Sequence, residues 1–188
     1  NPYYDYYSCV TEAEKVGGRT YQKIAGVDCW FECNFSSEMP ELNYDNPEVR
    51  QAMLDVAKYY LDLGVDGFRF DAVKYIYYGD TEQSVAFWEW YMEELRKIDP
   101  DVYVVGECWS GESEILAYYG AMNCFNFAVS QAEGMMASTA KGNSMSKYTS
   151  YMANYQKKVL EANPEGMVMS FLSNHDMDRI AGAFVTEN

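Results

Sequence analysis

Apolar positions along the chain alternate between two spacings, which predicts helices followed by strands. From Asn46-Pro47-Glu48 onward, apolar residues recur every three or four positions until Gly64, as they do on one face of a helix. Asn46 suits the N-cap, Pro47 the first helical position, and Gly64 the residue that ends a helix. The apolar face comprises Val49, Ala52, Met53, Val56, Tyr60 and Leu63. The pattern predicts one helix between Asn46 and Gly64.

The stretch after this helix has the period of a β-strand. Phe68 and Phe70 share one face, and Arg69 and Asp71 share the other, because side chains alternate along a strand. One face can therefore pack against helices while the other presents a guanidinium beside a carboxylate. The adjacent Arg69 favours the ionised form of Asp71, which suits a nucleophile. A structural ion pair at a strand end is the alternative.

The same order of helix and strand repeats three more times. A helix capped by Asp80 and stopped by Asp99-Pro100 precedes a strand at 102–107. A short helix near 112–122 precedes a strand near 124–129. After a polar stretch to about Ser146, a longer helix ends before Pro164, and a last strand covers 167–172. Strands that alternate with helices predict an α/β fold with a parallel sheet, and four such strands are half of a (β/α)8 TIM barrel.

Residues 1–38 are rich in tyrosine, interrupted by glycine and without a clear period. We expect an irregular segment with one short strand near 27–31. Its aromatic side chains could stack on sugar rings, although such residues more often fill a small local core.

The composition of the chain restricts the classes of molecule that it could bind. The chain has 188 residues, enough for one domain with a sizeable core, and a formal net charge of −15. This charge argues against nucleic acid, whose affinity comes from cationic side chains. No apolar run approaches the roughly 20 residues of a membrane span.

The sequence has five cysteines and a single histidine, His175, which argues against a zinc site made of Cys and His ligands. We interpret the cysteines as small core residues. This interpretation leaves the cellular compartment open.

Acidic residues stand at or just beyond the carboxyl ends of three predicted strands: Asp71, Glu107 and the pair His175-Asp176. In parallel sheets this edge gathers catalytic groups, because the loops there converge on one cleft. Acids in these positions also serve as helix N-caps. Acids on three separate strands nevertheless favour a shared site.

The environments of these acids differ. Glu107 follows an apolar strand and precedes Cys108-Trp109, so partial desolvation should favour its protonated form, whereas Asp71 should stay ionised. One acid that holds a proton and one that does not are required to cleave a glycosidic bond through a covalent intermediate. Asp176, beside His175, would then bind sugar hydroxyls and stabilise positive charge on the ring.

Four motifs resemble those of the alpha-amylase family of glycoside hydrolases (family 13), in the family's order. Residues 67–74 (GFRFDAVK) resemble its nucleophile strand, Val105-Gly106-Glu107 its acid/base strand, and Ser173-Asn174-His175-Asp176 its third-acid strand. Residues 39–43 (MPELN) resemble the motif that ends an inserted domain between barrel strand 3 and helix 3. The resemblance covers roughly residues 39–180.

The resemblance implies a fold and an activity. Residues 1–38 would be part of the inserted domain, and residues 39–188 would be a partial catalytic barrel with strands 4 to 7. The parent protein would be a retaining hydrolase of α-glucosidic bonds in starch-like glucans or maltooligosaccharides.

The resemblance also implies roles for single residues. Asp71 would be the nucleophile, Glu107 the general acid/base and Asp176 the transition-state stabiliser. Further residues would contact substrate: Arg69 and His175 at the cleaved bond, with Lys74 and Arg179 further along the groove.

Departures from the family pattern matter as well. Tyr75 follows Lys74, where many alpha-amylases have a histidine linked to calcium. No cofactor is required for the chemistry, and a structural calcium ion is an expectation only for a longer form. The sequence lacks the motifs of the other barrel strands, so we expect the 188-residue chain to self-associate and to be weakly active or inactive alone.

Three other functions fit the same residues. A transglycosylase would use the same machinery with a sugar hydroxyl in place of water. Asp71, Glu107, His175 and Asp176 could instead hold a divalent cation for phosphoester chemistry, which chelation would abolish. A non-catalytic carbohydrate-binding protein would lose little when Glu107 is changed to glutamine.

Overall fold

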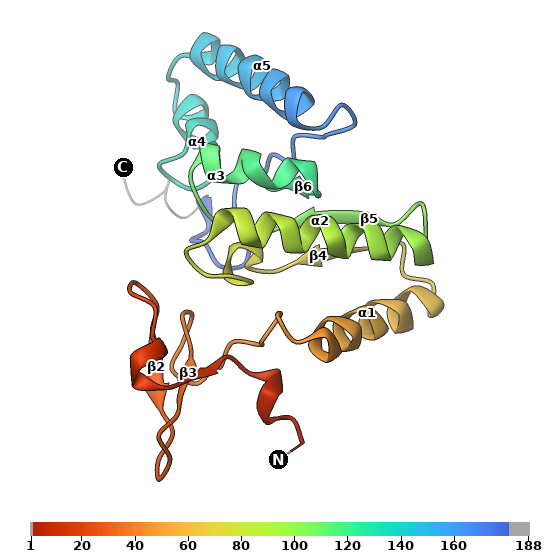
Figure 1. Ribbon diagram of the computed structural model, residues 1–188. Helices are drawn as coiled ribbons and strands as arrows, with labels where there is room; N and C mark the ends of the chain where they lie inside the picture. The colour runs from red at the N-terminus through yellow and green to blue at the C-terminus, as the bar shows by residue number, and fades with distance from the viewer. Residues whose placement is uncertain (1, 181–188) are drawn as a thin grey trace. The chain divides into compact units, whose positions relative to one another are not determined.

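The computed structural model, drawn in Figure 1, describes residues 2–180. It divides into two compact units. Unit 1 comprises Asn1–Phe68 and Val73–Tyr103, and unit 2 comprises Arg69–Ala72 and Val104–Asn188. No helix of the described part is both long enough and apolar enough to cross a membrane. The predicted division at residue 38 remains a prediction.

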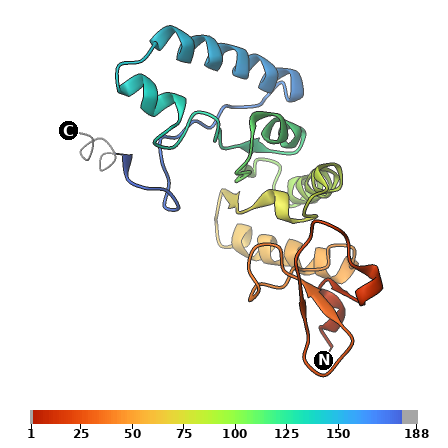
Figure 2. The same cartoon turned by 90° about the vertical axis from the view of Figure 1, so that its left-hand side faces the viewer.

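Unit 1 begins with a small antiparallel sheet, drawn in red and orange in Figure 2. Its strands are β1 (Cys9–Val10), β2 (Tyr21–Lys23) and β3 (Trp30–Glu32), in the order β1-β3-β2. The 3-10 helices η1 (Tyr4–Tyr6) and η2 (Glu12–Glu14) accompany it. The sequence predicted only one strand here, because strands of two or three residues are too short to show a period.

Helix α1 (Pro47–Asp62) confirms the predicted first helix. The Asn46 side chain accepts a hydrogen bond from the N–H of Glu48, and Gly64 adopts a φ of +91° just beyond the end. Only part of the predicted apolar face is buried. Val49 is buried, whereas Val56, Tyr60 and Leu63 are 47% to 65% exposed.

Helix α2 (Thr81–Ile98) packs against α1 within unit 1. The Asp80 side chain caps it by accepting from the N–H of Gln83, as predicted. The Tyr91 hydroxyl donates to the carbonyl of Met53 at 2.8 Å, which ties the two helices together. The 3-10 helix η3 (Val73–Tyr75) is held to α2 by the indole N–H of Trp88, which donates to the carbonyl of Val73 at 2.8 Å.

A three-stranded sheet has the order β4-β5-β6, formed by β4 (Gly67–Phe70), β5 (Tyr103–Gly106) and β6 (Asn123–Cys124). β5 and β6 are parallel, with Val105 opposite Asn123. The strands predicted at 124–129 and 167–172 are much reduced: among the described residues, their pairing beyond β6 is a parallel bridge between Phe125 and Met169. Apolar residues in these stretches, such as Val129 and Phe127, are buried. An apolar run signals burial but does not require a continuous hydrogen-bonded ladder.

The helices of unit 2 are α3 (Glu112–Ala117), η4 (Tyr118–Gly120), α4 (Met135–Ala140) and α5 (Met145–Ala162). α5 is the predicted long helix, begins after the Ser144 cap and packs against α3 and α4 (Figure 1). α4 lies in the stretch predicted to be irregular, and with six residues it is too short to show helical periodicity.

The core of unit 2 lies under α5. Tyr119, Tyr155 and Val159 are fully buried, and the Tyr119 hydroxyl donates to the carbonyls of Cys124 and Met167. All five cysteines are free, and all except Cys9 are buried, which confirms the interpretation as core residues for those four. Burial raises the pKa of the Cys124 thiol, so this thiol stays neutral.

Candidate active site

The carboxyl end of β4 presents an ion pair. A guanidinium nitrogen of Arg69, Nη1, donates to Oδ1 of Asp71, and the Asp71 side chain is 73% exposed. The pairing expected from strand alternation is therefore present. An exposed carboxylate beside a guanidinium is accessible to a substrate.

Glu107 follows β5 and lies against the end of β4. Its backbone N–H donates to the carbonyl of Phe70 at 2.8 Å, and its Oε2 accepts from the N–H of Ala72 at 2.8 Å. The side chain is buried, with the residue 7% exposed. The acid is thus held by the two residues that flank Asp71 in the sequence, because adjacent strands end at the same edge.

The third acid lies in the turn after residue 173. Nε2 of His175 is 3.1 Å from Oδ2 of Asp176, and both side chains are largely exposed. The N–H of Asp176 donates to Oδ1 of Asn174 at 3.0 Å, a local side-chain bond that shapes the turn.

Two pockets of unit 2 are lined by some of these residues, namely Arg69, His175 and Asp176, whereas Asp71 and Glu107 line neither of them. One, of about 220 Å³, is lined by Arg69, Phe125, Phe171, Ser173, Asn174 and His175. It brings together Arg69 and His175, from segments about a hundred positions apart. The other, of about 260 Å³, is lined by Trp109, Gln131, Ala132, Glu133, Asp176, Met177 and Asp178. Aromatic surface with a few polar groups is typical of small-molecule sites.

Several of these lining residues were not identified from the sequence. Trp109 is 38% exposed and stacks on Phe127, with ring centroids 5.1 Å apart. Phe171 packs edge-on against both Phe127 and Phe125. The available signal was position, because Trp109 follows Glu107 by two residues at the same strand end.

Two predicted substrate-binding residues lie outside these pockets. Lys74 belongs to unit 1, where its Nζ is 5.8 Å from the ring centroid of Tyr75. Arg179 is exposed in unit 2 and lines neither of the two pockets. Their roles in substrate binding remain predictions.

The described part of the chain offers no ready metal site. Within residues 2–180, no group of three or more His, Cys, Asp or Glu side chains could hold a metal ion. Tyr75, at the position of the calcium-linked histidine, packs its ring on Phe35 and Tyr78. A structural calcium ion in a longer form of the protein stays an expectation.

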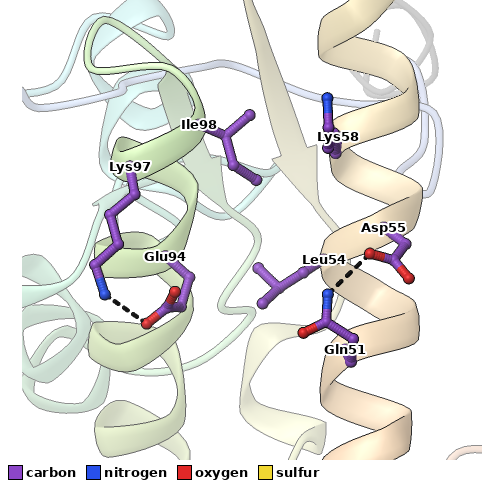
Figure 3. Close-up of a pocket in the computed structure, with 7 residues that line it drawn as sticks. All are labelled: Gln51, Leu54, Asp55, Lys58, Glu94, Lys97 and Ile98. Carbon is purple, nitrogen blue, oxygen red and sulfur yellow. Dashed lines mark hydrogen bonds and ion pairs between the residues drawn. The ribbon is translucent and has the colours of Figure 1, made fainter.

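A further pocket of about 280 Å³ lies between α1 and α2 of unit 1 (Figure 3). Leu54 and Ile98 point into the gap between the helices. Most of its charged side chains have local partners: Lys97 binds Glu94 at 2.7 Å, and Lys58 binds Asp62 at 2.7 Å. None of the predicted site residues lines this pocket, which is therefore not part of the candidate site.

The chain belongs to the alpha-amylase family, because residues 1–188 match the profile of the alpha amylase catalytic domain. It is 38% identical over 186 residues to Alpha-amylase 3 of Dictyoglomus thermophilum, covering 98% of this chain and 36% of that relative. It is 30% identical over 148 residues to a 4-alpha-glucanotransferase of Thermotoga neapolitana, covering 78% of this chain and 30% of that relative.

Solved structures give the same assignment. Amy13B of Eubacterium rectale superposes with a TM-score of 0.85 at 30% identity, covering 96% of this chain and 36% of that one. An alpha-amylase from H. orenii superposes with a TM-score of 0.76 at 27% identity, covering 98% and 39%. These neighbours are TIM-barrel enzymes, which confirms the α/β fold and the partial barrel. The chain spans a little over a third of such relatives and matches part of the alpha amylase catalytic domain.

Proposed function

We propose that the protein is a retaining glycoside hydrolase that acts on α-glucosidic bonds of starch-like glucans or maltooligosaccharides by double displacement. The observation that carries this proposal is the hydrogen bond from Ala72 to the Glu107 carboxylate. It sets a buried acid against the residue next to Asp71, which is exposed and paired with Arg69. A retaining glycosidase requires one carboxyl group that donates a proton and one that acts as a nucleophile, and a buried and an exposed carboxyl group match this requirement.

The reaction would proceed in two steps. Asp71 attacks the anomeric carbon while Glu107 donates its proton to the departing glycosidic oxygen, which forms a glycosyl ester and releases the shortened glucan. Glu107, now ionised, removes a proton from water, and that water displaces Asp71 from the sugar. Two displacements on the same carbon retain the anomeric configuration.

The remaining residues would hold the sugar and its charge. Asp176 would stabilise positive charge that develops on the ring. Arg69 and His175, which line one pocket, would bind hydroxyls next to the cleaved bond. Lys74 and Arg179 would contact more distant glucose units.

The anomeric product tests this mechanism. We expect the full-length protein that carries this sequence to release α-anomers from maltooligosaccharides, observed by proton NMR before mutarotation. A β-anomeric first product would contradict the double displacement. Activity on phosphoesters that is lost on chelation, without any sugar turnover, would replace the glycosidase with a metal-dependent enzyme.

Transglycosylation is a second candidate, favoured by the relative named 4-alpha-glucanotransferase. A sugar hydroxyl would take the place of water in the second step, and the residues described above do not distinguish the two acceptors. Products longer than the starting maltooligosaccharide would identify a transferase, whereas an increase in reducing ends alone would identify a hydrolase.

The isolated 188-residue chain is proposed to be weakly active and to self-associate. One face of α1 exposes Val56, Tyr59, Tyr60 and Leu63, each 47% to 65% exposed. These residues occupy positions i, i+3, i+4 and i+7 of the helix and form one apolar stripe. A second copy could bury the stripe in a symmetric contact, in which the same surface serves both partners.

Lysine at position 59 should weaken that contact. We expect Tyr59→Lys to shift the chain toward monomers in light scattering, because a buried ammonium without a partner is unfavourable. Gln51→Lys adds the same charge to α1 away from the stripe and should leave the association unchanged. A wild-type chain that is monomeric at all concentrations would contradict the proposal.

A further inference from the structure

Ala72 has an unusual backbone conformation directly after Asp71. Its φ is +46°, in the left-handed region, where a residue with a Cβ is disfavoured and glycine is the usual occupant. Alanine is nevertheless present at this position. A conformation of this kind persists only where the surrounding contacts hold it, and such residues gather at functional sites.

This conformation directs the Ala72 N–H to Oε2 of Glu107, at 2.8 Å. On the other side of Asp71, the carbonyl of Phe70 accepts from the N–H of Glu107, also at 2.8 Å. The residues before and after Asp71 therefore both bind residue 107, one through its backbone and one through its carboxylate. No other hydrogen bond from the described residues reaches this carboxylate.

We propose that Ala72 is a positioning residue, whose left-handed backbone fixes the carboxyl group of Glu107 with respect to Asp71 and selects the oxygen that carries the proton. The inference rests on the proposed function. A backbone N–H can only donate, so Oε2 must act as an acceptor in this contact. In the acid form the carbonyl oxygen is the better acceptor, so this contact favours the proton on Oε1, from which it would pass to the departing glycosidic oxygen.

The proposal predicts that a change at Ala72 lowers the rate by an amount that depends on the leaving group of the substrate. If the N–H is removed or redirected, Glu107 is misplaced as a proton donor, and a small misplacement can lower a rate by about 10²-fold. A fluoride leaving group departs as an anion and needs no proton from Glu107. A positioning role therefore predicts loss on maltooligosaccharides but not in the first step with α-maltosyl fluoride.

Two variants of the full-length protein test this prediction. Ala72→Val disfavours the left-handed conformation, because a β-branched residue is poorly tolerated there. Replacement of Ala72 by L-lactic acid converts its amide to an ester, which removes the N–H and keeps the side chain. We expect both to lower kcat/KM on maltooligosaccharides by about 10²-fold and to leave kcat/KM on α-maltosyl fluoride nearly unchanged.

Controls separate positioning from folding. Ala153→Val makes the same change at an exposed position of α5 and should affect neither substrate. Ala72→Gly keeps the N–H and permits the left-handed conformation. Its loss of kcat/KM on maltooligosaccharides should therefore be smaller than that of Ala72→Val. Equal losses on both substrates, or no loss in the ester variant, would overturn the inference. If circular dichroism shows that Ala72→Val does not fold, the activity of the ester variant on the two substrates tests the inference by itself.

An NMR measurement on the 188-residue chain is independent of activity. The amide proton of Ala72 should shift upfield in Glu107→Ala, because its acceptor is removed, and should not shift in Glu165→Ala, where the changed residue is an exposed glutamate of a loop. An unchanged Ala72 signal in Glu107→Ala would overturn the inference. A shifted signal in a protein without glycosidase activity would instead reject the proposed function and leave the contact standing.

Discussion

Replacement of Glu107 by glutamine is expected to lower kcat of the full-length protein on maltooligosaccharides by about 10³-fold, the usual scale of a lost general acid/base. Glutamine has nearly the same shape and can still accept the N–H of Ala72 through its amide oxygen. It has no acidic proton to give to the glycosidic oxygen. Steady-state kinetics should therefore show a loss in kcat with little change in substrate affinity.

The matched control is Glu165→Gln, which makes the same change at an exposed loop position and should have no measurable effect. Unchanged turnover in Glu107→Gln would reject Glu107 as the general acid/base. Sugar binding without any turnover in the wild-type protein would identify a non-catalytic carbohydrate-binding protein, for which the glutamine variant should behave like the wild type.

Replacement of Gly67 by alanine should destabilise unit 1 by about 3 kcal/mol, the upper range of ordinary overpacking. A Cβ at position 67 would lie 2.0 Å from the carbonyl oxygen of Tyr103 and 2.8 Å from its carbonyl carbon. Both are backbone atoms of β5, which cannot rotate away as a side chain would. The strands must separate locally, so the thermal midpoint should fall by roughly 6 to 12 °C.

Circular dichroism of the 188-residue chain measures this midpoint. Gly17→Ala is the control, because a Cβ there meets nothing within 4 Å, and it should leave the midpoint nearly unchanged. Equal midpoints for the two alanine variants would show that β4 and β5 are not packed as closely at Gly67 as the structure has them.

Helices were the part of the fold most readily predicted from the sequence. Asn46 and Asp80 cap α1 and α2 as their side chains suggested, since capping depends on neighbours within a few residues. The strands at 124–129 and 167–172 were overestimated, because an apolar run records burial and not hydrogen bonding. The exposure of Val56 and Leu63 was also missed. Their spacing predicts an apolar helix face, but it does not predict which residues pack against that face.

The sequence alone determined the local properties: where helices begin, which strands end in acids, and that Arg69 stands beside Asp71. These depend on residues close along the chain, whose geometry follows from the periods of helix and strand. Only the tertiary structure decided that the N–H of Ala72 binds Glu107, 35 positions away, and that Arg69 shares a pocket with His175. Such contacts arise when parallel strands align at one edge, and their register is set by the packing of the whole sheet.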